Sequence, residues 1–352
     1  MLACALALSL QLASLIAAAP SLSITVSSPE VTVNGVDNLH VTTTIHNTCD
    51  ETLKLLNDPH SILTPDWETD VFRIVKSEGG LGPDFRGVAT KWSPTLAVEV
   101  NSFTVILPGQ SIALVHDLSR RYDFTKAGAG VFDFHARDTF IHIDEEGNHV
   151  PLKADPPAPA SVAISGNLSP VRVSARSAKF TKRARFNGCT ADQKFTIEEA
   201  IVAATESAAF AHNYLGNHRT AATPRYTTWF GGFTASRHTT VANHFNKISR
   251  EGFARFTYDC GCPHKDVYAY VYPNKFGEIY LCPAFWNAPA RGTDSKAGTL
   301  IHESSHFTMN GGTKDVAYGQ PHCKSLAQSN PAQAVMNADS HEYFAENIPH
   351  LA

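Results

Sequence analysis

Residues 300–319 read LIHESSHFTMNGGTKDVAYG, and this stretch determines how the second half of the chain is interpreted. His302 and His306 are four residues apart, so on a helix both imidazoles project from one face, one turn apart. That geometry lets two ring nitrogens reach one ion at about 2.0–2.1 Å. Glu303 can act on a water molecule instead of binding the ion. The spacing predicts a helix over 294–310 that carries two zinc ligands and a general base.

The residues after the second histidine supply a candidate third ligand. A catalytic zinc site needs three protein ligands and one open position. Asn310-Gly311-Gly312 ends the predicted helix, and the glycines let the chain turn back towards the metal. Asp315 then provides a carboxylate, and Tyr318 follows three residues later. Taken singly, Asp315 also fits a surface or capping aspartate, and Tyr318 fits a packed aromatic residue.

The second half of the chain is predicted to be α+β and mainly helical. Apolar residues at helical spacing, together with a small strand pair around a Pro-Asn-Lys-Phe-Gly turn, support this prediction. Thr293 or Asp294 is the expected N-cap of the helix that carries the histidines. The predicted helices are 194–217, 235–250, 294–310 and 331–347, and the predicted strands lie within 267–286.

The first half has a different residue pattern. β-Branched or aromatic residues alternate with polar ones in short stretches that are separated by Gly, Pro and Asn. This pattern is typical of half-buried antiparallel strands. It predicts an all-β, sandwich-like unit of the immunoglobulin type with no catalytic constellation of its own. The predicted strands lie within 23–28, 30–35, 39–47, 96–109, 130–136 and 160–166.

The N-terminal residues and the net charge indicate in which compartment the protein is found and which partners it binds. Residues 1–19 are apolar and end in small residues, which predicts a secretory signal peptide and an extracellular protein; a membrane anchor is the alternative. The net charge of −4 gives no reason to expect binding to nucleic acid or to a membrane. A sequon at Asn167 is weakened by the proline that follows it, Pro170.

A basic linker joins the two halves. It contains the dibasic pair Lys182-Arg183, which predicts a processing site that divides a propeptide (20–183) from a catalytic domain (184–352). A cut after Arg185 is the alternative. The β-rich half would then assist folding or cover the active site. In a further alternative it stays attached as a substrate-binding or wall-binding module.

The cysteines are concentrated in the second half. In an oxidising compartment, four of them make a plausible framework of two disulfides. Cys323 is left over as a free buried thiol or an intermolecular partner, and Cys49 stands alone in the first half. The four framework cysteines are Cys189, Cys260, Cys262 and Cys282.

The combination of HExxH with GTKDVAYG (312–319) resembles the aspzincin signature of the deuterolysin family. Further stretches at 220–231, 268–282 and 335–347 resemble the fungal peptidyl-Lys metalloendopeptidases, secreted enzymes that cut on the amino side of lysine. The resemblance implies one zinc ion per catalytic domain, protein or peptide substrates that contain lysine, and a monomer. It implies zinc ligation by His302, His306 and Asp315, water activation by Glu303, oxyanion stabilisation by Tyr318, and the disulfides Cys189–Cys260 and Cys262–Cys282.

The same resemblance implies that Asp339 and Glu342 form the pocket for the lysine. On a helix these carboxylates share a face, where they could hold an ammonium group. From spacing alone, an exposed acidic helix face is the commoner outcome, and His341 between them has no assigned role. Two other functions are kept as alternatives: a neutral protease of broader, deuterolysin-type specificity, and a secreted zinc-binding protein without catalysis. Glu303 and Tyr318 count against the second, because a metal binder needs neither.

Overall fold

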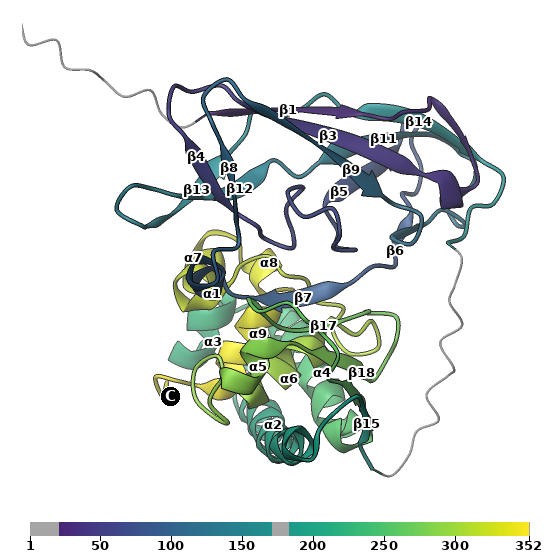
Figure 1. The fold of residues 1–352 in the computed structure, drawn as a ribbon. Helices are drawn as coiled ribbons and strands as arrows, with labels where there is room; N and C mark the ends of the chain where they lie inside the picture. Colours follow the sequence, from purple (N-terminus) through teal and green to yellow (C-terminus); the bar gives the residue numbers. More distant parts are fainter. Residues whose placement is uncertain (1–20, 171–182, 352) are drawn as a thin grey trace, which may run out of the picture.

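The computed structural model describes residues 21–170 and 183–351, which form two units (Figure 1). The N-terminal unit is built from strands, and the C-terminal unit is mainly helical. The predicted signal peptide, 1–19, and Lys182 of the predicted processing pair lie outside the described residues. Among the described residues, no helix is both long enough and apolar enough to span a membrane.

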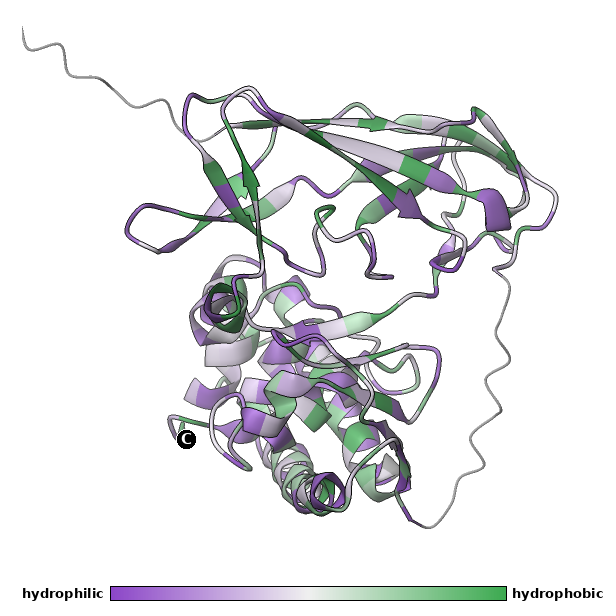
Figure 2. Cartoon of the chain, in the orientation of Figure 1, coloured by the Kyte–Doolittle hydropathy of each residue, from purple (hydrophilic) through white to green (hydrophobic). Residues whose placement is uncertain are grey.

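The N-terminal unit packs its sheets around one apolar core, and hydrophobic and hydrophilic residues alternate along its strands (Figure 2). A three-stranded sheet has the order β1 (Leu22–Ser27), β3 (His40–Asn47), β9 (Ser111–Asp117). A four-stranded sheet has the order β2 (Thr32–Asn34), β14 (Ala160–Ser165), β11 (Gly130–Ala136), β5 (Phe72–Lys76). The other has the order β13 (His149–Lys153), β12 (Thr139–Ile143), β4 (Leu53–Leu56), β8 (Phe103–Ile106). A short pair joins β6 (Asp84–Phe85) to β10 (Tyr122–Asp123).

The predicted many-stranded first half is therefore confirmed, whereas its immunoglobulin-like topology stays a prediction. One predicted strand is wrong in part, because the stretch 96–109 begins within the helix α1 (Pro94–Glu99) and only then forms β8. The side chain of Ser93 accepts a hydrogen bond from Leu96 N, and Pro94 occupies the first turn. An N-cap serine followed by proline starts a helix despite the alternating apolar residues behind it.

The C-terminal unit places helices around a five-stranded sheet. Its strands have the order β15 (Arg185–Asn187), β16 (Thr257–Asp259), β18 (Glu278–Leu281), β17 (Val267–Val271), β7 (Ala89–Trp92). The longer helices are α2 (Ala191–Asn217), α4 (Ala235–Glu251), α6 (Lys296–His306), α7 (Gly319–Ser329) and α9 (Ala338–Glu346). The shorter ones are α3 (Pro224–Phe230), α5 (Pro283–Asn287) and α8 (Pro331–Ala334), and 3-10 turns cover η1 (Val36–Asn38) and η2 (Phe253–Arg255).

Three predicted helix boundaries need correction. The helix α6 begins at Lys296 with Ser295 as its N-cap, not Thr293 or Asp294, because Ser295 Oγ accepts from the backbone N–H of the third helical residue. It also ends at His306, four residues earlier than predicted. The predicted helix 331–347 is two helices, α8 and α9. The sequence analysis did not predict α3, α5 or α7. The helix α5 occupies the end of the stretch 267–286, which was predicted as two strands, because Pro283 starts a helix directly after β18.

The edge strand of the C-terminal sheet comes from the other half of the chain. The strand β7, residues Ala89–Trp92, runs antiparallel to β17, with Thr90 opposite Tyr270 and Lys91 opposite Ala269. All four of its residues are buried. The sequence analysis missed this strand, because ATKW has no alternation that separates it from a loop.

Both disulfides that the resemblance implied are present. Cys189–Cys260 spans 71 residues and Cys262–Cys282 spans 20. Cys49 and Cys323 are free and buried. Of the two states predicted for Cys323, a free buried thiol or an intermolecular partner, the structure shows the free buried thiol.

The two disulfides are expected to differ in their contribution to stability. In the chain-entropy description, the longer loop constrains the unfolded chain more, by about 1 kcal/mol for this difference in length. Replacing Cys189 and Cys260 with serine should therefore lower the free energy of unfolding by about 1 kcal/mol more than replacing Cys262 and Cys282. Urea unfolding of the two double variants measures this difference. The reverse order would contradict the entropic account.

Candidate active site

The helix α6 and the turn after it bring three buried ligand atoms to one point. The Nε2 atoms of His302 and His306 lie 3.1 Å and 3.3 Å from Asp315 Oδ1. All three atoms are buried, yet none makes a hydrogen bond within the part of the chain that the structure describes. Buried polar atoms are normally paired, so their convergence within 4.8 Å of one another marks a metal-binding set.

Neighbouring groups fix the orientation of both imidazoles. His306 Nδ1 donates to the carbonyl oxygen of Thr313 at 2.9 Å, which leaves its Nε2 lone pair free. His302 Nδ1 faces Asp339 Oδ1 at 2.8 Å and Glu342 Oε2 at 3.3 Å, with the same consequence. Such outer contacts hold metal-binding histidines in the ligating tautomer. Two imidazole nitrogens and one carboxylate oxygen are a donor set that fits zinc.

The glycine turn delivers the third ligand, as the sequence predicted it could. Gly312 has a φ of 59°, in the left-handed region that favours glycine. The turn is held against the end of α6, since Gly312 N donates to the carbonyl of Phe307 at 3.1 Å and Thr313 N donates to that of Ser305 at 3.2 Å. Asp315 follows this fixed turn and is buried beside both histidines.

Glu303 is placed beside the ligand set without joining it. Its carboxylate is fully buried, and Oε1 accepts a hydrogen bond from Lys91 N at 3.2 Å. Burial raises the pKa of Glu303 to about 7, although the neighbouring imidazoles of His302 and His306 act to lower it. A carboxyl group with a pKa near neutrality can both take up and return a proton.

Tyr318 points its hydroxyl at the same strand. Its oxygen donates to the carbonyl of Thr90 at 3.0 Å and lies 2.7 Å from His60 Nδ1. Burial and the nearby charge of Asp315 raise the pKa of Tyr318 well above its ordinary value. The phenol therefore stays protonated and available as a hydrogen-bond donor.

Glu342 and Asp294 hold an ammonium group. Lys91 reaches in from β7, and its Nζ forms an ion pair with Glu342 Oε1 and lies 3.2 Å from Asp294 Oδ1. The Tyr268 ring lies 4.6 Å from the same nitrogen. Asp339 takes a different place, at His302 Nδ1 and at the backbone N–H of Gly319.

Of the two residues predicted to form a pocket for a substrate lysine, Glu342 contacts the ammonium group of Lys91 and Asp339 contacts His302, and the pocket for the substrate stays a prediction. Asp294, which the sequence analysis considered only as a helix cap, takes the second place beside the ammonium group. It has a φ of 53° and is steadied by Tyr343, whose hydroxyl donates to Asp294 Oδ1 at 2.8 Å. No local pattern in the sequence marks this aspartate, because α6 and α9 meet only in the folded chain.

A close approach between α6 and α9 makes this arrangement possible. A Cβ atom at Gly298 would lie 2.1 Å from Glu346 Oε1 and 2.7 Å from Glu342 Oε1. Glu346 Oε1 in turn accepts hydrogen bonds from the N–H and Oγ of Ser295, at 2.9 Å and 2.8 Å. Only glycine at position 298 lets both glutamates lie against the start of α6.

His60 comes from the N-terminal unit and lies over the same site. Its Nε2 is 3.3 Å from Asp315 Oδ2. Burial would lower the pKa of His60, but the carboxylates of Asp315 and Asp58 raise it to about 9. A cavity of about 390 Å³ is lined by residues of both units, among them His60, Ala89 and His306. The N-terminal unit therefore forms part of the wall around the candidate metal centre.

Comparisons with known proteins identify the family of the chain. A family model described as lysine-specific metallo-endopeptidase matches residues 215–346. The chain is 50% identical over 342 residues to a peptidyl-Lys metalloendopeptidase of Grifola frondosa, which covers 96% of each chain. It is 45% identical over 337 residues to one of Armillaria mellea, which covers 95% of this chain and 94% of the relative.

The chain belongs to the aspzincin family. The solved zinc peptidase from Grifola frondosa is 54% identical and covers 47% of this chain and 100% of its own, with a TM-score of 0.46. The resemblance seen in the sequence is confirmed, and this aspzincin is a zinc metalloendopeptidase. The roles of the individual residues remain predictions that rest on the geometry above.

The placement of Asp339 predicts a role in metal affinity. Asp339→Asn should weaken zinc binding by about 10- to 100-fold, because His302 loses the carboxylate that fixes its tautomer. Competition with a zinc chelator measures the affinity. Asp294→Asn is the matched control and should leave zinc affinity unchanged, because that carboxylate contacts Lys91 and Tyr343. Equal affinities for Asp339→Asn and the unaltered protein would contradict this role.

Proposed function

We propose that this aspzincin is a secreted proenzyme whose C-terminal unit hydrolyses peptide bonds on the amino side of lysine. The observation that carries the proposal is the ion pair of the Lys91 ammonium group with Glu342, completed by Asp294. Burial would lower the pKa of Lys91, but these carboxylates raise it well above its ordinary value. The pocket thus holds a lysine side chain in its charged form.

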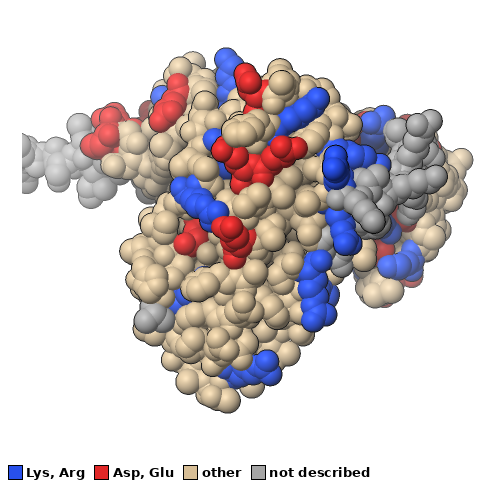
Figure 3. All heavy atoms as spheres, turned by 90° about the horizontal axis from the view of Figure 1, so that it is seen from below, with Lys and Arg blue, Asp and Glu red and all other residues tan. Residues whose placement is uncertain are grey.

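The chemistry of such a pocket favours lysine over acidic and apolar side chains. Glu342 is fully buried, so an acidic side chain would meet uncompensated negative charge and an apolar one would leave the carboxylate unpaired. The charged side chains on the face shown in Figure 3 are of both signs and interspersed. That face carries no broad field of one sign, and we assign the preference for lysine to the buried carboxylates.

The residues around the metal centre can carry out hydrolysis. Zinc, when bound, supplies a Lewis acid and makes a water molecule more acidic. Glu303 accepts the proton of the attacking water and returns it to the amine that leaves. The Tyr318 hydroxyl donates to the oxygen of the carbonyl group under attack, as it does to Thr90 O here. A well-placed donor of this kind contributes roughly 2.7–4 kcal/mol to stabilising the transition state.

Secretion and the proenzyme state belong to the same proposal. Two disulfides are typical of an oxidising compartment. A relative named extracellular protease, from Aeromonas hydrophila, is 33% identical over 323 residues. The N-terminal unit places His60 and β7 against the metal centre, which supports its role as a propeptide.

The position of β15 supports processing after Arg183 over a cut after Arg185. Arg185 N donates to the carbonyl of Phe256 at 3.0 Å, and Arg185 pairs with Thr257 in the sheet. A cut after Arg183 leaves β15 whole, whereas one after Arg185 removes the first residue of the strand.

Mapping the cleavage sites in a denatured proteome tests the proposed function. The matured, zinc-loaded protein should generate peptides that begin with lysine, and these should be absent with a chelator or with Glu303→Gln. Mass spectrometry identifies the new N-termini. Chelator-sensitive cuts without a preference for lysine would indicate the broader neutral protease. No cuts by folded protein that contains zinc would indicate a zinc-binding protein without catalysis.

The two carboxylates of the pocket should contribute unequally. Glu342→Gln should lower kcat/KM for a lysyl peptide by at least about 30-fold, since breaking a buried charge pair costs about 2 kcal/mol or more. Asp294→Asn should lower it by up to about fivefold, because its side chain is 41% exposed and its charge is screened. Asp192→Asn, an exposed change at the start of α2, is the control. Zinc content is measured for each variant, because Glu342 also faces His302.

A further inference from the structure

The strand β7 lies in the active site in the manner of a substrate. Thr90 pairs with Tyr270 and Lys91 pairs with Ala269, so the chain continues the sheet at its edge. An extended peptide that adds a strand to a sheet edge is bound through its main chain, and side-chain pockets then select its residues. We propose that the Thr90–Lys91 peptide bond is the enzyme's own cleavage site and is cut within the same molecule. This inference rests on the proposed function.

Three contacts that favour cleavage on the amino side of lysine are present at this bond. The lysine side chain is in the acidic pocket, where Nζ pairs with Glu342. The carbonyl oxygen of the preceding residue, Thr90, accepts from the Tyr318 hydroxyl at 3.0 Å. The amide nitrogen of Lys91 lies 3.2 Å from Glu303 Oε1. The leaving nitrogen is therefore beside the group that returns the proton.

The chemical step is an ordinary hydrolysis. The oxygen of a water molecule bonds to the carbonyl carbon of Thr90, and the bond from that carbon to Lys91 N breaks. Glu303 passes one proton from the water to the departing nitrogen, and the second proton of the water reaches that nitrogen when the new carboxylic acid ionises. The products are a carboxylate at Thr90 and an ammonium group at Lys91, and no reactant other than water is consumed.

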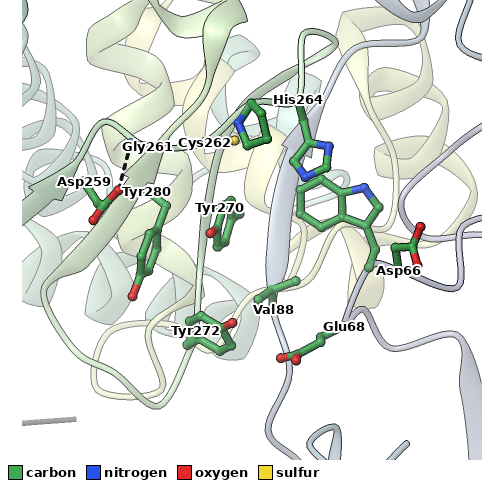
Figure 4. Close-up of a pocket in the computed structure, with 12 residues that line it drawn as sticks. Asp66, Glu68, Val88, Asp259, Gly261, Cys262, His264, Tyr270, Tyr272 and Tyr280 are labelled. Carbon is green, nitrogen blue, oxygen red and sulfur yellow. Dashed lines mark hydrogen bonds between the residues drawn. The ribbon is translucent and has the colours of Figure 1, made fainter. Parts of the chain in front are cut away.

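Contacts on both sides hold the bond in place. After it, Trp92 Nε1 donates to Asp266 Oδ2 at 3.0 Å. Before it, Val88 N donates to the carbonyl of Glu68 at 2.8 Å, and both residues line a pocket between the units (Figure 4). A peptide held at both ends reacts with the entropy cost of positioning already met.

Burial restricts the cut to the molecule's own active site. Thr90 is completely buried and Lys91 is 2% exposed, so another copy cannot reach the bond while the strand is docked. The rate of cleavage should therefore be first order and independent of protein concentration.

The test uses the full chain, prepared with a chelator and then given zinc. Intact mass and N-terminal sequencing follow the appearance of a fragment that begins at Lys91, and a lysine-containing reporter peptide is measured in parallel. The unaltered chain should form the fragment at a rate that does not change over a tenfold range of concentration. Glu303→Gln should not form it, even when mixed with the unaltered chain. Lys153→Ala, which removes a propeptide lysine whose side chain is 69% exposed, should leave the cut unchanged.

Several outcomes would overturn this inference and leave the proposed function intact. A chain that cuts the reporter before lysine but keeps Thr90–Lys91 intact has the proposed function without the self-cleavage. Cleavage whose rate rises with concentration, or that occurs equally in Glu303→Gln chains of the mixture, would place the cut between molecules.

If the unaltered chain cuts neither the reporter peptide nor the Thr90–Lys91 bond, a second variant is needed to distinguish failure of the inference from failure of the proposed function. Lys91→Glu should expel the strand from the acidic pocket, and circular dichroism and zinc content check its folding. If folded Lys91→Glu cuts the reporter, the strand is a stable inhibitor and the self-cleavage is overturned. If folded, zinc-containing Lys91→Glu leaves the reporter intact, the proposed function itself fails.

Discussion

Charges buried between α6 and α9 must be paired, and the site depends on that constraint. His302 lies between the two groups of acids, with Asp315 at its Nε2 and with Asp339 and Glu342 at its Nδ1. Removing one partner from such a set leaves an uncompensated buried charge, which costs several kcal/mol. The same helix contact therefore orients the candidate metal ligands and forms the acidic pocket around Lys91.

This shared construction links the candidate metal centre to the acidic pocket around Lys91. Glu342 faces His302 with one carboxylate oxygen and Lys91 with the other. Gly298 permits the two helices to approach closely enough for both contacts. A substitution of Glu342 therefore also affects the metal centre. A substitution of Asp294, which contacts Lys91 and Tyr343, affects the metal centre less.

The N-terminal unit reaches the site through two short segments that contact it from different directions. The loop that carries His60 contacts Asp315 and Tyr318, and β7 adds an edge strand to the sheet. One segment lies at the candidate metal ligands, and the other carries Lys91 into the acidic pocket. The docked unit thus covers the candidate metal centre and the acidic pocket around Lys91 together.

The sequence by itself determined the parts of the protein that are local in the chain. The HExxH spacing, the glycine turn and Asp315 lie within 14 consecutive residues, and helical geometry is enough to bring them together. The strand texture of the first half and most helices of the second follow equally from periodicity. The sequence predicted the ends of helices less accurately than their existence. Ser295 is the N-cap of α6, whereas Thr293 or Asp294 was predicted.

Only the tertiary structure decided the contacts between distant segments. Asp294 and Glu342 are 48 positions apart and meet because α6 packs on α9. Lys91 is 251 residues from Glu342, and nothing in ATKW marks it as a strand of the other unit. Periodicity describes which face of an element is buried, whereas the partner of that face depends on packing that no local pattern encodes.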